Sequence, residues 1–408
     1  MTEPKWIVIY EPEATGHQME NVRYLLQGFR AHATSPRLLL LTSQDALDHP
    51  NCQRVIAEYS DLLATVVTPP VRGTGRVFRA MGSFYHRQWV QAQALKAGLQ
   101  QIGPDRIGFI IVPHLEAIGL LQIALTPALF RGKPWSVIAI ANRFHHQACN
   151  IAGPRNWVDG MQRLLFRWII RDPKLICFGT INPYFPVYAD NPKVMHCPDP
   201  CAVPVLSTPE VGRRAYGVPA DACVVLVFGF IDKRKCLDLL VQAVRRVRPD
   251  LKLTILLAGP QHPGHMRDVL SSPDANALRD AGCLIEVNRF ILNGKDIDPM
   301  SAADIAWVYY DRNFVNSSSV LVRSALSRKA VIARRQGVIG RQVEEHELGF
   351  AIGSEDPAEI AAALTRLAED KQLRIRMGDN GARAFADHTP ENFSRPIIDA
   401  AHKVLTPV

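Results

Sequence analysis

The chain has no long uninterrupted hydrophobic run. A membrane-spanning helix needs about 18 or more consecutive apolar residues without charge. The nearest approach, residues 107–130, is interrupted by Pro113, His114, Glu116, Gln122 and Pro127. We therefore expect no helix that crosses a membrane. The opening segment, residues 1–10, lacks the layout of a signal peptide and enters a strand-like run directly, so a cytoplasmic location is expected.

Metal-binding patterns are also scarce. The eight cysteines are spread over the chain, and several lie in apolar surroundings where thiols behave as small hydrophobic groups. One cluster, His196, Cys197 and Cys201, has suggestive spacing, but a tetrahedral site needs a second ligand pair and none stands nearby. We predict no metal here and interpret the segment as a proline-rich linker.

The charge balance favours anionic partners. Lys and Arg number 47 against 39 Asp and Glu, which gives a net charge of +8 and suits nucleotides, lipid head groups or nucleic acid. The cations are dispersed, and no zinc-finger spacing or aromatic-basic repeat is present. Nucleic acid is therefore not an expected partner.

The first half of the chain alternates strands with helices. Helical patterns cover residues 21–31 and 82–101, and this βα alternation predicts a parallel, doubly wound α/β sheet. The apolar runs that we interpret as strands are residues 6–10, 38–41, 64–67, 108–112, 136–140 and 176–180.

Prolines concentrate in residues 192–209, which we interpret as an extended connection between two Rossmann-like domains, 1–195 and 205–390. The same alternation then begins again, and residues 391–408 are expected to pack back on the first domain. A pocket is expected in a cleft between the domains. Strands are predicted at residues 224–228, 253–257, 283–287, 305–309 and 330–333, and helices at 237–248, 320–328, 356–369, 372–386 and 395–405.

Two segments of the second half have the features of phosphate sites. The apolar run 224–228 ends in Gly229 and then in Lys233, Arg234 and Lys235, and ligands of open α/β sheets bind just beyond the carboxyl ends of such strands. The run 305–309 is followed by serines that open an apolar helix, where free backbone N–H groups attract anions. Together they predict a diphosphate held between the two segments.

These residues resemble the retaining glycosyltransferases of family 4, which have the two-domain GT-B fold and are also called glycosyl transferases group 1. The resemblance extends over residues 195–390 and is looser before them. It is carried by the segments 228–237, 256–260, 303–306, 317–321, 329–333 and 340–350. It implies that the C-terminal domain binds a UDP- or GDP-sugar as substrate, with no cofactor or metal. It also implies that the N-terminal domain holds a saccharide, lipid-linked or other glycoconjugate acceptor.

Two positions depart from the family pattern. The family commonly has two glutamates eight positions apart, and alignment on residues 329–332 puts Val315 and Arg323 in their places. Arg323 replaces a hydrogen-bond acceptor with a charged donor in the donor site. Two alternatives therefore stay open, namely a member that binds the nucleotide without turnover, and a nucleotide-sugar epimerase.

In the C-terminal domain, Arg234 and Lys235 are the residues expected to grip the departing diphosphate, beside Gly229. The alternative is a solvated basic turn, which is the interpretation that we favour for Lys233. The three serines Ser317, Ser318 and Ser319 either contact phosphate or cap the helix.

In the N-terminal domain, the candidate residues follow three predicted strands, and the family's catalytic histidine falls closest to His145 or His146. Retention of configuration is inherited from the resemblance, and we favour front-side attack with the leaving phosphate as base. The loop candidates on the acceptor side are Gly16, His17, His114 and Glu116.

The segment from Trp157 to Arg171 has helical spacing with an arginine at every fourth position. A basic amphipathic helix of this kind can lie on an anionic membrane surface, which gives a peripheral membrane contact. The other interpretation, which we favour, is a helix that packs its Trp and Leu face inward and turns its arginines to water.

Overall fold

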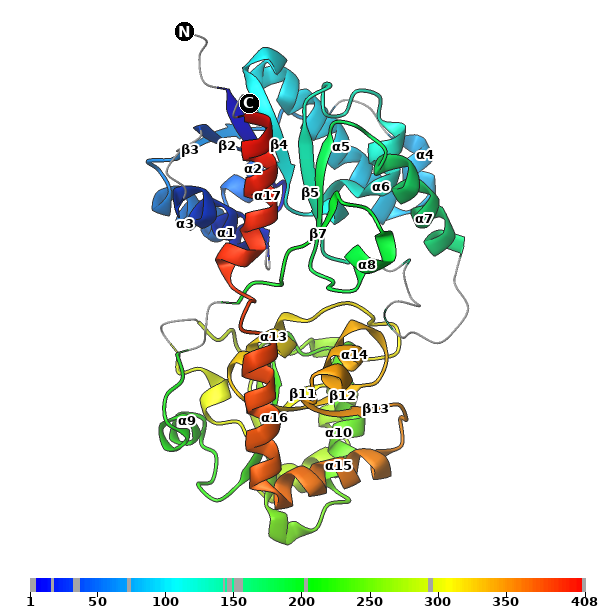
Figure 1. Ribbon diagram of the computed structural model, residues 1–408. Coiled ribbons are helices and arrows are strands. Elements are labelled where there is room, and N and C mark those ends of the chain that lie inside the picture. Colours follow the sequence, from blue (N-terminus) through cyan, green and yellow to red (C-terminus); the bar gives the residue numbers. More distant parts are fainter. Residues whose placement is uncertain are drawn as a thin grey trace. The chain divides into compact units, whose positions relative to one another are not determined.

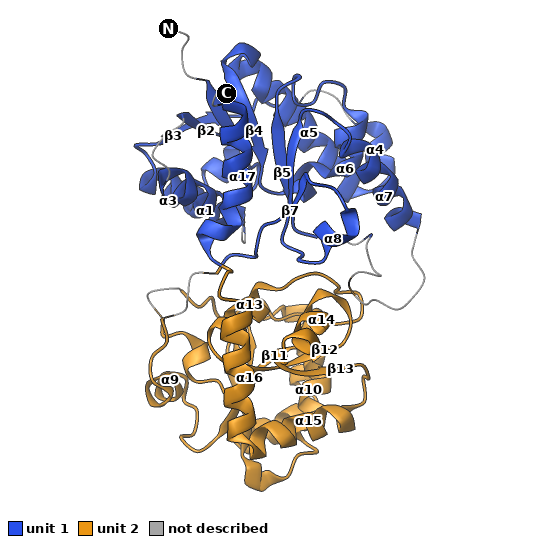
Figure 2. Ribbon diagram, in the orientation of Figure 1, with its two compact units in different colours: residues 1–148, 153–200, 389–408 blue, residues 149–152, 201–388 orange. Residues whose placement is uncertain are grey.

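The computed structural model describes residues 5–15, 18–31, 37–71, 75–141, 144, 149, 157–201, 205–292 and 296–405. The chain divides into two compact units (Figure 2). Unit 1 comprises Met1–Ala148, Gly153–Pro200 and Thr389–Val408, and unit 2 comprises Cys149–Ala152 and Cys201–His388. Each unit is built around its own parallel sheet (Figure 1).

Unit 1 contains a 7-stranded sheet in the order β3-β2-β1-β4-β5-β6-β7, in which all neighbouring strands are parallel. The central strand β4 is buried along its whole length, because helices cover both faces of the sheet. The strands are β1 (Trp6–Tyr10), β2 (Arg37–Thr42), β3 (Leu63–Val67), β4 (Ile107–Val112), β5 (Trp135–Ala139), β6 (Leu175–Thr180) and β7 (Val194–His196).

Along most of the strands, residues face two separate hydrophobic cores on the two sides of the sheet. Helices α1 (Gln18–Ala31), α3 (Pro50–Glu58) and α17 (Pro390–Leu405) cover one core, and α5 (Ser83–Ile102), α6 (Leu115–Leu125) and α7 (Trp157–Ile169) cover the other. The short helices are α2 (Gln44–Leu47), α4 (Arg76–Ala80) and α8 (Phe185–Ala189). Helix α17 returns from unit 2 and packs on α1 at Gly28, where a side chain would collide with Ser394.

Unit 2 contains a 6-stranded parallel sheet in the order β10-β9-β8-β11-β12-β13. Helices lie on both faces, with α10, α12 and α15 over one core and α13 and α14 over the other. The strands are β8 (Cys223–Phe228), β9 (Leu253–Ala258), β10 (Leu284–Val287), β11 (Ile305–Val308), β12 (Ala330–Arg334) and β13 (Gly349–Ile352). The helices are α9 (Pro209–Tyr216), α10 (Leu237–Val244), α11 (Pro263–Leu270), α12 (Pro273–Asp280), α13 (Ser319–Leu326), α14 (Gly337–Glu345), α15 (Pro357–Glu369) and α16 (Lys371–Ala384).

Two parallel sheets with helices on both faces confirm the predicted fold class. The expected extended connection is wrong at its end, because Pro209 opens helix α9 with Thr208 as its N-cap. Proline is well tolerated at the first helical position, since its missing N–H would have no helical partner there. The short strands β7 and β13 were not predicted. Among the helices that the structure describes, none is long and apolar enough to cross a membrane.

Candidate functional site

The strand order of unit 2 reverses beside β8. The chain runs from β8 outward through β9 and β10, and then returns to β11 on the other side of β8. The loops after β8 and β11 therefore leave the sheet in opposite directions. In open α/β sheets this divergence creates a crevice at the carboxyl ends of the strands, where ligands bind.

The loop after β8 begins with a close contact between two glycines. Gly229 has φ 88° and Gly259 has φ 142°, both in a region that other residues rarely adopt. A side chain at Gly259 would collide with the carbonyl group of Gly229. The loop is then fixed by two backbone hydrogen bonds, from Ile231 N to Pro260 O and from His262 N to Ile231 O, each 2.8 Å.

Three consecutive cations form a single 3-10 turn after this loop, Lys233–Lys235. Asp232 caps the turn by accepting from Arg234 N at 3.0 Å, and its carboxylate also pairs with Arg234 Nε at 2.9 Å. Lys233 is exposed, and the Arg234 side chain is half-exposed. Lys235 is 4% exposed, so the three cations have three different environments.

The buried Lys235 ammonium links the end of β8 to the end of β11. Its Nζ donates to Phe228 O at 3.0 Å and to Tyr310 Oη at 2.9 Å, and it lies 4.6 Å from the centre of the Tyr310 ring. Tyr310 Oη is in turn 3.0 Å from Ser318 Oγ, which accepts from Val320 N at the start of α13. A continuous polar chain therefore joins the basic turn to the N-terminus of a helix.

Of the three serines, Ser318 is the N-cap of α13 and is buried, as the capping interpretation expects. Ser319 is the first helical residue, and Ser317 precedes the cap. The structure thus places all three at the helix end that the polar chain reaches. A phosphate contact by any of them stays a prediction.

The two positions that lack the family glutamates have different surroundings. Arg323 lies one turn into α13, where its guanidinium forms an ion pair with Asp298 and lies 5.3 Å from the Phe228 ring centre. Val315 is buried, and its carbonyl accepts from Val338 N at 3.1 Å. The positive charge of Arg323 is therefore already neutralised by the carboxylate of Asp298.

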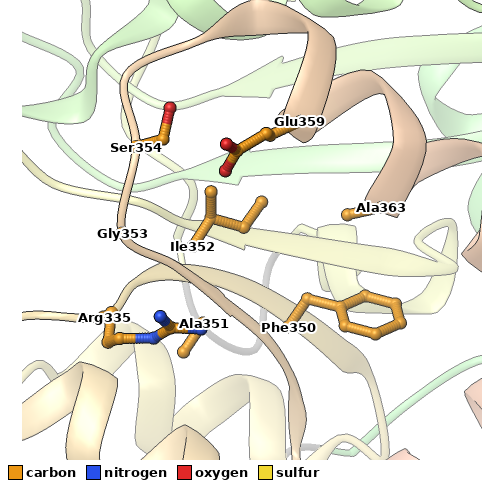
Figure 3. Close-up of a pocket in the computed structure, with 8 residues that line it drawn as sticks. All are labelled: Arg335, Phe350, Ala351, Ile352, Gly353, Ser354, Glu359 and Ala363. Carbon is orange, nitrogen blue, oxygen red and sulfur yellow. The ribbon is translucent and has the colours of Figure 1, made fainter.

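A cavity of about 380 Å³ lies at the edge strand β13, beside α15 (Figure 3). Two strands, β11 and β12, separate β13 from β8, so this cavity is not the crevice described above. The residues predicted to bind the donor are absent from its lining. Its lining residues are Arg335, Phe350, Ala351, Ile352, Gly353, Ser354, Glu359 and Ala363.

The strand order of unit 1 reverses between β1 and β4, and a buried carboxylate and a histidine meet there. Glu11 follows β1, and its Oε2 lies 2.5 Å from Nδ1 of His114, which is the second residue after β4. His114 Nε2 lies 3.0 Å from Asn21 Nδ2 in the first turn of α1. Burial alone would lower the pKa of His114, but the charge and hydrogen bond of Glu11 outweigh it and raise that pKa.

Glu116 joins the ends of β4 and β5. Its Oε1 accepts from the backbone N–H groups of Ile140 at 2.9 Å and Ala141 at 2.5 Å. Its Oε2 is buried and has no hydrogen-bond partner among the residues that the structure describes. Burial raises the pKa of the Glu116 carboxyl, although the two amide hydrogen bonds oppose this shift.

The other predicted residues of the N-terminal domain, Gly16, His17, His145 and His146, lie outside the described residues. Sequence reasoning missed Glu11 and Tyr310, although each follows a strand at a point of strand reversal, which was a usable signal. It also missed Asp298, which is distant from Arg323 in sequence. Within the described ranges, no group of three or more His, Cys, Asp or Glu side chains is placed to hold a metal ion.

Residues 222–370 match the sequence profile of the family described as glycosyl transferases group 1. The matched range contains β8, the basic turn, Tyr310 and α13. Residues 222–370 form a group 1 glycosyl transferase domain within unit 2. The resemblance that its motifs carried is thereby confirmed for this unit.

Curated relatives match less than half of this chain. A D-inositol 3-phosphate glycosyltransferase of Corynebacterium kroppenstedtii is 30% identical over 183 residues, which is 42% of this chain and 38% of that protein. The enzyme of the same name from Kineococcus radiotolerans is 28% identical over 225 residues, which is 47% of this chain and 50% of that protein. The chain thus spans half or less of the length of these relatives.

Solved structures match along almost the entire chain. Sucrose-phosphate synthase from Thermosynechococcus elongatus has a TM-score of 0.67 at 15% identity. The match covers 98% of this chain and 98% of that protein. The Anabaena protein HepE, in complex with UDP, has a TM-score of 0.66 at 14% identity, with 98% of this chain and 100% of HepE covered. At these identities the likeness establishes the fold, and the predicted GT-B class is confirmed.

Proposed function

We propose that this protein is a glycosyltransferase that takes a sugar from a UDP- or GDP-sugar held by unit 2. The observation that carries the proposal is the position of the buried Lys235, at a strand reversal inside a group 1 domain. The names of the relatives, D-inositol 3-phosphate glycosyltransferases, and the UDP bound in the Anabaena neighbour support it. The acceptor is a saccharide, a lipid-linked sugar or another glycoconjugate, bound by unit 1.

The site offers positive charge where a diphosphate would lie. A lysine ammonium has three N–H donors, and Lys235 directs two of them to Phe228 O and Tyr310 Oη. We assign the third to a phosphate oxygen. The N-terminus of α13 adds the positive end of a helix dipole, and the half-exposed Arg234 supplies a fork of donors at the rim.

These groups would act by stabilising the negative charge that develops on the leaving diphosphate. The bond between the anomeric carbon and the phosphate oxygen breaks, and a bond from that carbon to the acceptor oxygen forms. The hydroxyl proton of the acceptor passes to the diphosphate. This front-side route retains configuration and requires placement and charge stabilisation. A double displacement requires a carboxylate nucleophile, which neither Val315 nor Arg323 supplies.

A second candidate function is donor binding without transfer, and the Arg323–Asp298 pair favours it. The ion pair leaves the position of the second family glutamate with a guanidinium that a protein carboxylate already holds. A sugar hydroxyl at this position would therefore lose its usual acceptor. Nucleotide binding and sugar transfer must be measured separately for this reason.

Isothermal titration with UDP and GDP tests the donor site. We expect at least one nucleotide to bind at millimolar concentration or below, and Lys235→Met to weaken that binding. Lys233→Met is the matched control, because Lys233 lies in the same turn and is exposed. If neither nucleotide binds, or if both variants bind the nucleotide as tightly as the wild type does, the assignment of the donor site to Lys235 is wrong.

Product analysis with labelled UDP- and GDP-sugars then separates the functions. Release of the free nucleoside diphosphate, by transfer or by hydrolysis, supports the glycosyltransferase. Binding with an unchanged donor supports the non-catalytic alternative. An isomerised nucleotide sugar would instead identify an epimerase and overturn the proposal.

A further inference from the structure

Helix α7 presents large apolar side chains to solvent. Trp157 is 73% exposed, Leu164 69% and Trp168 59%. Their spacing of seven and four residues places them on one face of the helix. The opposite face carries Phe166 and Ile169, which are buried in the core of unit 1. The favoured sequence interpretation, with both tryptophans packed inward, is therefore wrong.

A second exposed apolar group lies on α4 and the start of α5. Val77 is 71% exposed, Phe84 48% and Met81 42%. Arginines border it, and the Arg87 guanidinium lies 5.9 Å from the centre of the Phe84 ring. Arg76 and Arg79 on α4 are also exposed. This group has the same combination of apolar and basic side chains as α7.

Both groups belong to one layer of helices in unit 1. Helix α4 packs on α5, α5 on α6, and α6 on α7, and the last three cover the same core. Figure 1 shows α4, α6 and α7 on the same side of this unit. We call this surface the α4–α7 face, defined by Val77, Met81, Phe84, Trp157, Leu164 and Trp168.

The charge on these four helices is mostly positive. Helices α4, α5, α6 and α7 contain six lysines and arginines against two acidic residues. Of the two acids, Asp159 is buried and Glu116 is bound to backbone amides. The exposed charge on these helices is therefore of one sign.

We propose that the α4–α7 face docks unit 1 on an anionic lipid bilayer. The tryptophans, Leu164 and Phe84 would enter the boundary between head groups and acyl chains, as the apolar face of an interfacial helix does. The exposed Arg167 on α7 and the exposed Arg171, two residues after its end, would lie against lipid phosphates. The single sign of the charge over several helices favours a lipid surface over a protein partner, because a bilayer offers negative charge over a wide area.

Co-sedimentation with vesicles tests this proposal independently of the nucleotide site. The vesicles contain phosphatidylcholine alone or mixed with phosphatidylglycerol, at low and at high salt. We expect binding to the mixed vesicles at low salt, reduced at high salt because ions screen the attraction. Brominated lipids in the same vesicles should quench tryptophan fluorescence, and Trp157→Phe with Trp168→Phe should remove that quenching.

Two double variants identify the surface. Leu164→Glu with Trp168→Glu should abolish sedimentation. Arg167→Gln with Arg171→Gln should weaken it by about 25-fold, since each arginine near an anionic surface contributes about fivefold. The matched control in unit 2 is Ile375→Glu with Arg376→Gln, an exposed apolar residue beside an exposed arginine.

All variants should keep the thermal midpoint and the nucleotide affinity of the wild type, because the substituted side chains are exposed. The control should also sediment as the wild type does. The proposal is overturned if wild-type protein does not bind the mixed vesicles at low salt. It is equally overturned if the control loses binding as much as the α7 variants do.

Discussion

Replacing Lys235 by methionine separates what this side chain does for folding from what it does for the donor. Its ammonium is buried against a carbonyl oxygen, a tyrosine hydroxyl and an aromatic ring. Among the ion pairs of the described residues, none gives Lys235 a carboxylate partner. Methionine has a side chain of similar length that can fill the same space without charge or donors.

The opposing contributions to stability are of similar size. Burying an ammonium costs several kcal/mol even after the protein relaxes. Its two hydrogen bonds return about 1.5–3 kcal/mol each, and the ring contact returns about 0.5–2 kcal/mol. We therefore expect Lys235→Met to change the free energy of unfolding by less than about 2 kcal/mol. Nucleotide affinity should fall by about tenfold to a hundredfold, since one charge-assisted hydrogen bond to phosphate is lost.

Urea denaturation and isothermal titration on the same protein samples measure the two effects. A large loss of stability would mean that Lys235 is mainly structural. Unchanged nucleotide affinity in a folded variant would refute the assignment of the third N–H to the diphosphate. Lys233→Met, in the exposed position of the same turn, should change neither quantity.

Three further substitutions test the surrounding geometry. Gly259→Ala should lower the free energy of unfolding by about 3 kcal/mol in urea denaturation, because φ is 142° and the new methyl group would collide with Gly229. A neutral result would mean that the loops after β8 and β9 are not in contact. Ser318→Ala should lower the free energy of unfolding by about 1 kcal/mol, because the N-cap of α13 is lost. Ser318→Asp should keep the wild-type stability, since aspartate caps equally well, and thermal melting of both variants measures the difference. The pKa of His114 is raised in the folded state, so protonation of His114 stabilises the fold. This stabilisation is fully present below the pKa of the unfolded state, about 6.5, and is lost as pH rises through the folded-state pKa. The pH dependence of urea unfolding in this window should therefore be weaker in His114→Gln, and an unchanged profile would contradict the pairing with Glu11.

The architecture was largely predictable from the sequence because buried parallel strands leave a strong local signal. The run that forms β8 is apolar throughout and is bounded by turn residues, as both faces of the sheet are covered. Strand β13 was not predicted because it is a four-residue edge strand that is only partly buried for most of its length. Pro209 was interpreted as the end of a connection, although proline is equally common at the start of a helix.

The position of the candidate site in the fold was predictable from the sequence, but the contacts between its side chains were not. The sequence placed Lys235 after a strand end, but burial of its ammonium depends on the Tyr310 hydroxyl, 75 residues away. The pairing of Arg323 with Asp298 depends in the same way on tertiary structure. For α7 the helical period was correct and its orientation was not, because apolar residues occur on both of its faces. Amphipathic spacing alone does not reveal which face meets the core.

A crystal structure of the protein with UDP or GDP bound tests the central claim most directly. Our account predicts the diphosphate between the ends of β8 and β11, within about 3 Å of Lys235 Nζ and beside the first turn of α13. A nucleotide bound elsewhere, such as in the cavity beside β13, with Lys235 still enclosed by protein, would contradict it.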